Sequence, residues 1–169
     1  ILPESLTTIG NNAFYECNSM TKLTLGNEVI SIGKSAFEKC EKLNEVHLGE
    51  KLTSIGNNAF YGCLQLKEII IPDEVTDIGE KSFSETGLSK VVIGANVETL
   101  ETMVFSKCSS LKEIIIPESV KTIGLYVFSE CDNLKKVELG KNIETIGDEC
   151  FENCSSLETI KIPDSVKAI

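Results

Sequence analysis

Hydrophobic positions return along the chain with a period of 23 residues. An Ile-Gly pair, or a single Ile or Leu in its place, marks the start of each period: Ile9, Ile32, Ile55, Ile78, Leu100, Ile123, Ile146 and Ile169. Every step between these positions is 23 residues, except the step of 22 from Ile78 to Leu100. A fixed period of this length is typical of repeat proteins, in which stacked copies bury a shared core that no single copy could form.

Within each period, the order of apolar, polar and turn residues predicts two kinds of local structure. The stretch LKEIIIP at residues 66–72 is rich in β-branched residues and ends in Pro72, which indicates one short strand. Equivalent strands would pair in parallel, about 4.8 Å apart. The stretch IGxxAF turns the chain, and its second half could form a single helical turn. The sequence therefore predicts an α/β repeat solenoid, mostly β. We expect a right-handed arc with one parallel strand per repeat in a concave sheet, and irregular turns or single helical turns on the convex side.

One repeat, at residues 78–100, departs from this pattern. Phe83 and the following Leu88 are five residues apart instead of six, and Thr86 stands where most copies have cysteine. We expect the concave sheet to continue through this repeat without a break. The missing residue would be absorbed by a tighter turn at Thr86 and Gly87, and the array would open first at this repeat when it is destabilised.

The consensus CxxLxxIxIPxxVxxIGxxAF resembles the BspA-type leucine-rich repeat, a class with a period of 23 residues. The resemblance covers nearly all of the 169 residues, and seven consecutive copies make it specific. The chain departs from the more general pattern LxxLxLxxNxL, because Pro or Gly follows the strand. The resemblance implies a leucine-rich-repeat arc used for binding. Many members of the family are cell-surface or secreted proteins, and several are linked to adhesion to host proteins.

Two positions of the repeat form a structural ladder of phenylalanine and cysteine. The phenylalanines are Phe14, Phe37, Phe60, Phe83, Phe105, Phe128 and Phe151, and the cysteines are Cys17, Cys40, Cys63, Cys108, Cys131 and Cys154. Stacked copies would point their thiols in parallel, whereas a disulfide needs Cβ atoms about 3.8 Å apart and a zinc site needs four converging ligands. We interpret the cysteines as small buried apolar side chains. Disulfides, a metal site and a redox role are the alternatives.

Composition narrows the classes of function. The formal net charge is −10, and all sixteen basic residues are lysine, so no basic stripe for nucleic acid is present. No apolar run approaches the roughly 18 residues that span a bilayer. The single histidine, His47, leaves little room for a catalytic triad, and no phosphate loop occurs. We expect no enzyme activity, no cofactor, no bound metal, no nucleic-acid partner and no membrane insertion.

The solvent-facing side of the predicted sheet is the better candidate for a site. Side chains alternate along a strand, so Ile70 should point outward between the buried Ile69 and Ile71. Outward positions of neighbouring copies form the candidate binding face: His47, Ile70, Val92, Ile115 and Glu138, with Glu68, Lys90 and Glu113 beside them. An apolar strip with a polar rim is typical of a protein-binding patch. Alternatively, β-branched residues merely suit an exposed strand.

We therefore expect one leucine-rich-repeat solenoid over residues 1–169, with about seven repeats. Because both ends stop at the same phase of the repeat, we expect a fragment of a longer array that can associate end to end. The predicted function is a non-enzymatic protein-binding or adhesion module at the cell surface or outside the cell, with a host or extracellular-matrix protein as its partner. The alternative is a structural spacer or targeting arm for other domains. Asn153 begins a glycosylation acceptor pattern, which matters only in a eukaryotic secretory pathway.

Overall fold

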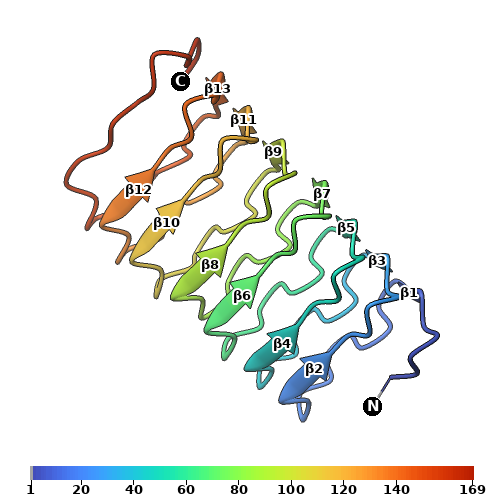
Figure 1. The fold of residues 1–169 in the computed structure, drawn as a ribbon. Coiled ribbons are helices and arrows are strands. Elements are labelled where there is room, and N and C mark those ends of the chain that lie inside the picture. Colours follow the sequence, from blue (N-terminus) through green and yellow to red (C-terminus); the bar gives the residue numbers. More distant parts are fainter. Residues whose placement is uncertain (1) are drawn as a thin grey trace.

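A computed structural model describes residues 2–169, which wind into a parallel solenoid with one turn for each repeat (Figure 1). The predicted parallel solenoid is confirmed. The first row of strands, called the three-residue row, is the predicted strand of the repeat. It contains β2 (Lys22–Thr24), β4 (Glu45–His47), β6 (Glu68–Ile70), β8 (Lys90–Val92), β10 (Glu113–Ile115) and β12 (Lys136–Glu138).

Each repeat also carries a second, shorter strand that the sequence pattern did not predict. This two-residue row contains β1 (Thr8–Ile9), β3 (Ser31–Ile32), β5 (Ser54–Ile55), β7 (Asp77–Ile78), β9 (Thr99–Leu100), β11 (Thr122–Ile123) and β13 (Thr145–Ile146). The register joins equivalent residues of neighbouring repeats, such as Ile32 with Ile55. Figure 1 shows the two rows as separate lines of arrows along the molecule.

A column of phenylalanine rings forms the centre of the core. Consecutive rings from Phe14 to Phe151 stack nearly parallel, with centroids 5.2 to 5.9 Å apart. The five inner rings are completely buried. Leucine and isoleucine side chains of both strand rows belong to the same buried cluster, which includes residues of every repeat. The core is therefore continuous along the solenoid.

The turns that carry the phenylalanines are irregular, and residues 2–169 contain no helix, so the single helical turn that we considered does not form. Each of these outer turns contains two residues with positive φ, four positions apart, such as Asn12 and Glu16 or Lys81 and Glu85. In this backbone conformation every second N–H points at the next repeat. Asn12, Phe14 and Glu16 donate to the carbonyls of residues 34, 36 and 38 at 2.8 to 2.9 Å. The outer turns are thus joined by their own ladder of hydrogen bonds.

The predicted tighter turn at Thr86 and Gly87 does not form, because the missing residue removes the turn that a regular repeat has at Leu64 and Gln65. Here the chain passes so close to Leu64 that a Cβ atom on Gly87 would lie 2.2 Å from the Leu64 carbonyl oxygen. The outer ladder continues through this repeat, because Phe83 N donates to Val104 O at 3.0 Å. The deletion is therefore accommodated without loss of the outer hydrogen bonds.

The prediction that the sheet continues without a break is wrong. In the three-residue row, strands pair only as β2 with β4, β6 with β8, and β10 with β12, so that β8 and β10 are not paired. In the two-residue row, β1, β3, β5 and β7 form one sheet and β9, β11 and β13 form another. The single interruption of this second row among residues 2–169 falls between β7 and β9, at the irregular repeat.

The residue that directly follows β9 explains this interruption, because it is not the glycine found at the same place in most repeats. Most repeats place glycine directly after the two-residue strand, and a Cβ atom on Gly56, for example, would lie 2.7 Å from backbone atoms of Gly33 and Lys34. Real Cβ atoms do not approach that closely, so this position admits only glycine while the repeats stay in contact. After β9 the position holds Glu101, and no hydrogen bond joins Glu101 N to Ile78 O, whereas Gly79 N donates to Ile55 O in the regular row.

Candidate protein-binding surface

The three-residue row presents its outward side chains in a line across the repeats. In most of these strands the first and third residues are exposed and the middle residue is buried, as strand alternation requires. Three neighbouring third positions are large and apolar: Ile70 is 62% exposed, Val92 43% and Ile115 64%. We call these three residues the apolar strip.

Two open hollows adjoin the apolar strip, and each lies where neighbouring strands are not paired. The hollow between β4 and β6 has a volume of about 510 Å³ and is lined by His47, Glu68 and Ile70. The hollow between β8 and β10 has a volume of about 550 Å³ and includes Val92, Ile115 and Glu138 in its lining. All three residues of the apolar strip therefore line a depression that an incoming side chain can enter: Ile70 lines the first, and Val92 and Ile115 line the second.

Charged residues of both signs border the strip. Glu68, Lys90 and Glu113 occupy the outward first positions of β6, β8 and β10, and Glu68 is in direct register with Lys90. His47 Nε2 donates a hydrogen bond to the Glu45 carboxylate at 2.7 Å, and Lys22 donates another to the same carboxylate at 2.7 Å. These two contacts hold the pKa of the Glu45 carboxyl below its usual range, with the hydrogen bond from Lys22 as the larger cause.

The structure brings the eight residues of the candidate face onto one surface, with His47 and Glu138 at its two ends. The loop that follows each strand also contributes to the hollows, which the strand pattern alone did not indicate. Pro72, Asp73 and Glu74 line the first hollow, and Pro117 lines the second. Pro72 and Pro117, which follow two of the predicted strands, were the signal that could have identified these wall residues.

The cysteines lie inside the outer turns, and all seven are free thiols. Each thiol from Cys40 onward in the ladder donates a weak hydrogen bond to the carbonyl oxygen of a phenylalanine in the preceding repeat, at 3.1 to 3.3 Å: Cys40 to Phe14, Cys63 to Phe37, Cys108 to Phe83, Cys131 to Phe105 and Cys154 to Phe128. A thiol thus combines apolar volume with one donor, which explains cysteine rather than alanine at this position. In residues 2–169, no group of three or more His, Cys, Asp or Glu side chains is placed to hold a metal ion.

Because the thiols are buried, the free energy of unfolding should fall as the pH becomes alkaline. Burial raises the pKa of Cys108 from 9.0 to about 11, because the thiolate is poorly solvated inside the turn. Above pH 9 the unfolded chain loses this proton while the folded chain keeps it, so the free energy of unfolding falls as pH rises through this window. Between pH 8 and about pH 10.5, we expect the shifted pKa of Cys108 alone to lower the free energy of unfolding by about 2 kcal/mol, measured by urea denaturation. Cys108→Ala should remove this share of the pH dependence. An equal loss in both proteins would contradict the assignment.

No helix of residues 2–169 has the length and apolar character needed to cross a membrane.

The chain is similar to a known repeat family and to several solved structures. The model of the BspA type Leucine rich repeat region, in six copies, matches residues 1–112 and 102–169. A T. pallidum leucine-rich repeat protein, TpLRR, is 29% identical with a TM-score of 0.84, and the match covers 90% of this chain and 72% of that one. A leucine-rich repeat protein from Bacteroides ovatus is 32% identical with a TM-score of 0.72, over 95% of this chain and 48% of that one.

A third solved structure is described as a leucine rich cell surface protein from Faecalibacterium prausnitzii. It is 26% identical with a TM-score of 0.56, and the match covers 95% of this chain and 52% of that chain. The chain therefore spans about half the length of two of these three proteins. No curated protein sequence matches the chain significantly. The repeat consensus, the parallel solenoid and the match over the whole sequence agree, and the chain belongs to the BspA-type leucine-rich repeat family.

Proposed function

We propose that this array is a non-enzymatic protein-binding module of a cell-surface or secreted protein, and that its partner docks on the three-residue row. The observation that carries the proposal is the apolar strip of Ile70, Val92 and Ile115, whose exposed side chains line two hollows. Apolar side chains that fill or flank pockets at the centre of a surface supply most of the energy in protein–protein interfaces. The mixed charges of Glu68, Lys90 and Glu113 form the polar rim.

Membership of the family supports a location at the cell surface or outside the cell, because one related structure is described as a cell surface protein. Free thiols are compatible with that location, since the buried cysteines are shielded from oxidants by the outer turns. The proposed partner is an extracellular protein, such as a host matrix or serum protein.

The proposal is tested by replacing two residues of the apolar strip. We expect Ile70→Glu/Ile115→Glu to weaken binding to purified matrix or serum proteins by about a hundredfold, because it places two charges in the centre of the interface. The matched control is Leu64→Glu/Leu125→Glu. It adds the same charge at exposed leucines outside the three-residue row and should bind like the wild type.

Binding is measured by biolayer interferometry against an immobilised panel of these proteins. If the wild type binds no member of the panel, or if both double variants bind equally well, the proposed binding face is wrong. A role as a structural spacer would then account for the array.

A further inference from the structure

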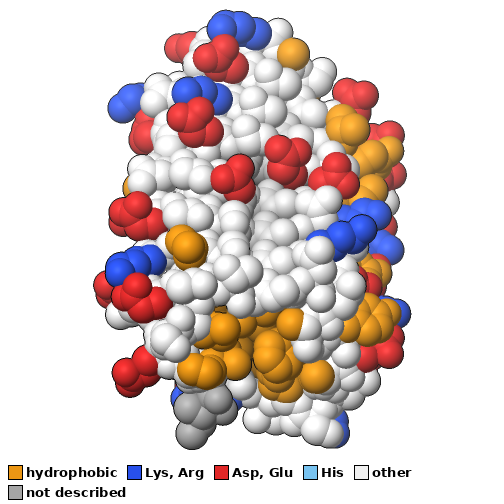
Figure 2. All heavy atoms as spheres, turned by 90° about the vertical axis from the view of Figure 1, so that its right-hand side faces the viewer, with side chains coloured by type: hydrophobic (Ala, Val, Ile, Leu, Met, Phe, Trp, Pro, Cys, Tyr) orange, Lys and Arg blue, Asp and Glu red, His pale blue; other side chains and the backbone are white. Residues whose placement is uncertain are grey.

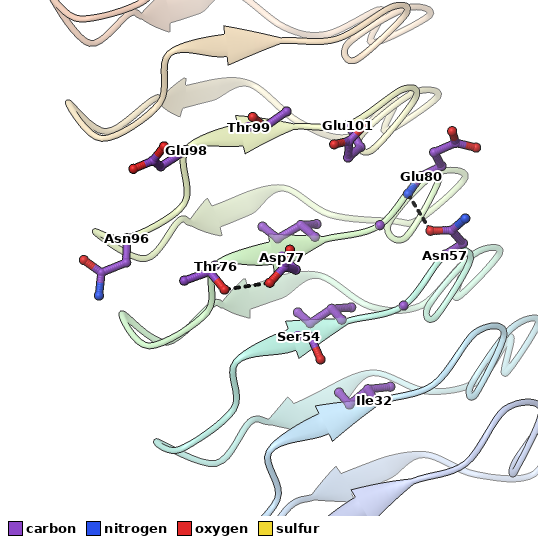
Figure 3. A pocket seen from close by; sticks show the side chains of 14 residues that line it. Ile32, Ser54, Asn57, Thr76, Asp77, Glu80, Asn96, Glu98, Thr99 and Glu101 are labelled. Carbon is purple, nitrogen blue, oxygen red and sulfur yellow. Dashed lines mark hydrogen bonds between the residues drawn. The ribbon is translucent and has the colours of Figure 1, made fainter.

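Open hollows also lie away from the three-residue row. One of about 750 Å³ opens at the interruption between β7 and β9, on a face where acidic side chains stand across the middle (Figure 2). Inside it, the Thr76 hydroxyl already binds Asp77 at 2.7 Å (Figure 3). Within the described part of the chain, the interruption leaves backbone donors open as well as acceptors, such as Glu101 N and Ile78 O. This cleft therefore favours no single class of ligand.

A more selective hollow, of about 440 Å³, lies on the outer turns. Its floor consists of the side chains that directly follow the ladder phenylalanines of three consecutive repeats: Ser84, Ser106 and Ser129. The equivalent side chains of the other repeats are larger: Tyr15, Glu38, Tyr61 and Glu152. The three small side chains therefore leave a hollow between larger neighbours, and we call it the serine groove.

The walls of the serine groove come from the left-handed residues of the same turns. One wall holds Lys81, Met103 and Tyr126, and the other holds Glu85, Lys107 and Glu130. Lys107 lies 3.4 Å from Glu85 and 4.0 Å from Glu130, so part of the charge is balanced inside the groove. With four glutamates and two lysines, the lining offers hydrogen-bond acceptors and donors side by side and has a small excess of negative charge.

One hydroxyl on the floor of the groove is left for a ligand. The hydroxyls of Ser106 and Ser129 bind each other at 3.1 Å. Ser84 is only 4% exposed, and its hydroxyl has no hydrogen-bond partner within residues 2–169. A buried hydroxyl needs such a partner. Because Ser84 lines the groove, the partner can come from whatever fills it.

We propose that the serine groove binds a neutral glycan chain, with one pyranose ring over each serine. A sugar hydroxyl both donates and accepts hydrogen bonds, so it can pair with the hydroxyls, the carboxylates and the ammonium groups of this lining. The C–H groups on the face of a pyranose ring pack well against the negative face of an aromatic ring, and Tyr61 and Tyr126 supply two such rings. The excess of carboxylates disfavours an acidic sugar.

The spacing of the repeats fits an extended chain of sugars. The rings of Phe83, Phe105 and Phe128, which directly precede the three serines, are 5.7 and 5.9 Å apart. This is close to the length that one pyranose ring adds to an extended β-1,4-linked chain, so successive sugars would meet equivalent positions of successive repeats. The serine groove is separate from the apolar strip, and the proposal does not depend on the proposed function of the three-residue row.

The test titrates cellotriose, a neutral β-1,4-linked trisaccharide, against the ¹⁵N-labelled protein. Sorbitol is the control ligand, because it carries hydroxyls but no ring. We expect cellotriose to give saturable shifts of the amide signals of residues 81–85, 103–107 and 126–130, and sorbitol to give none. The absence of saturable shifts with cellotriose, an equal response to sorbitol, or shifts confined to other residues would overturn the proposal.

A filled groove provides the first test by mutation. Ser106→Tyr introduces the residue that two other repeats already carry at this position, so the array should fold while the floor of the groove is blocked. We expect the affinity for cellotriose to fall by at least about tenfold. The matched control is Ser109→Tyr, which places the same side chain at an exposed position outside the groove and should bind like the wild type. Undiminished binding by a folded Ser106→Tyr protein would show that the groove is not the site.

Removal of the free hydroxyl provides the second test. Ser84→Ala breaks no side-chain hydrogen bond within residues 2–169, so the thermal midpoint should stay the same or rise. The affinity for cellotriose should nevertheless fall by about fivefold, because one hydrogen bond to the sugar is lost. A purely structural role of Ser84 predicts no change in affinity, and that result would contradict the proposed placement of the sugar over the serines.

Discussion

Replacing Phe60 by alanine is expected to lower the free energy of unfolding by about 3–5 kcal/mol. The ring is completely buried, and it stacks on Phe37 at 5.3 Å and on Phe83 at 5.4 Å. Its removal leaves a cavity in the middle of the core and takes contacts from both neighbouring repeats. The outer hydrogen-bond ladder keeps the backbone from collapsing into that space, so little of the loss is recovered.

Phe14 provides the matched comparison for this prediction. Its ring is only partly buried and stacks on a single neighbour, Phe37, at 5.2 Å. Phe14→Ala should therefore cost about half as much as Phe60→Ala, measured for both by urea denaturation followed by circular dichroism. Equal losses for the two variants would show that the rings do not stabilise the array through their neighbours.

The second large effect is expected from Gly56→Ala, which should destabilise the array by about 2–3 kcal/mol. A Cβ atom at this position would lie 2.7 Å from backbone atoms of the preceding repeat, and backbone cannot move aside as a flexible side chain can. We expect the hydrogen bond from Gly56 N to Ile32 O to break and the two-residue row to separate there.

Gly10 makes the matched control, because nothing lies within 4 Å of a Cβ atom built on it. Gly10→Ala should leave the free energy of unfolding unchanged or raise it by a few tenths of a kcal/mol. Hydrogen exchange of the amides of residues 54–56 locates the expected separation in Gly56→Ala. If both variants melt alike, close packing of the repeats at the glycine position is not what excludes other residues.

The parts of the fold that could be predicted from the sequence are those encoded by side chains. The recurrence of phenylalanine and of the strand pattern indicated the core, the parallel register and the outward direction of Ile70, because burial and strand alternation act on residue type directly. The two-residue row was missed because Thr8 and Ile9 directly precede a glycine, and such a short segment gives no alternation to recognise.

The sequence contains the cause of the interruption between β7 and β9, because Glu101 replaces the usual glycine. The shortened spacing before Leu88 instead indicated an irregularity in the outer turn, where the strands are not interrupted. Glycine is needed directly after the two-residue strand because the backbones of neighbouring repeats approach closely there, and not because the local turn requires it. This could not be known without the distance between neighbouring backbones.

The outer turns have a consequence for how the chain folds. A left-handed residue other than glycine costs about 1 kcal/mol. Each outer turn carries two left-handed positions, and among residues 2–169 only Gly62 places a glycine at one of them. Hydrogen bonds to the adjacent turn offset this cost. The left-handed conformation is therefore unfavourable in a turn whose neighbour has not yet folded. Folding of the array should therefore begin with a slow nucleus of two adjacent repeats and then extend rapidly, each finished turn acting as the template for the next.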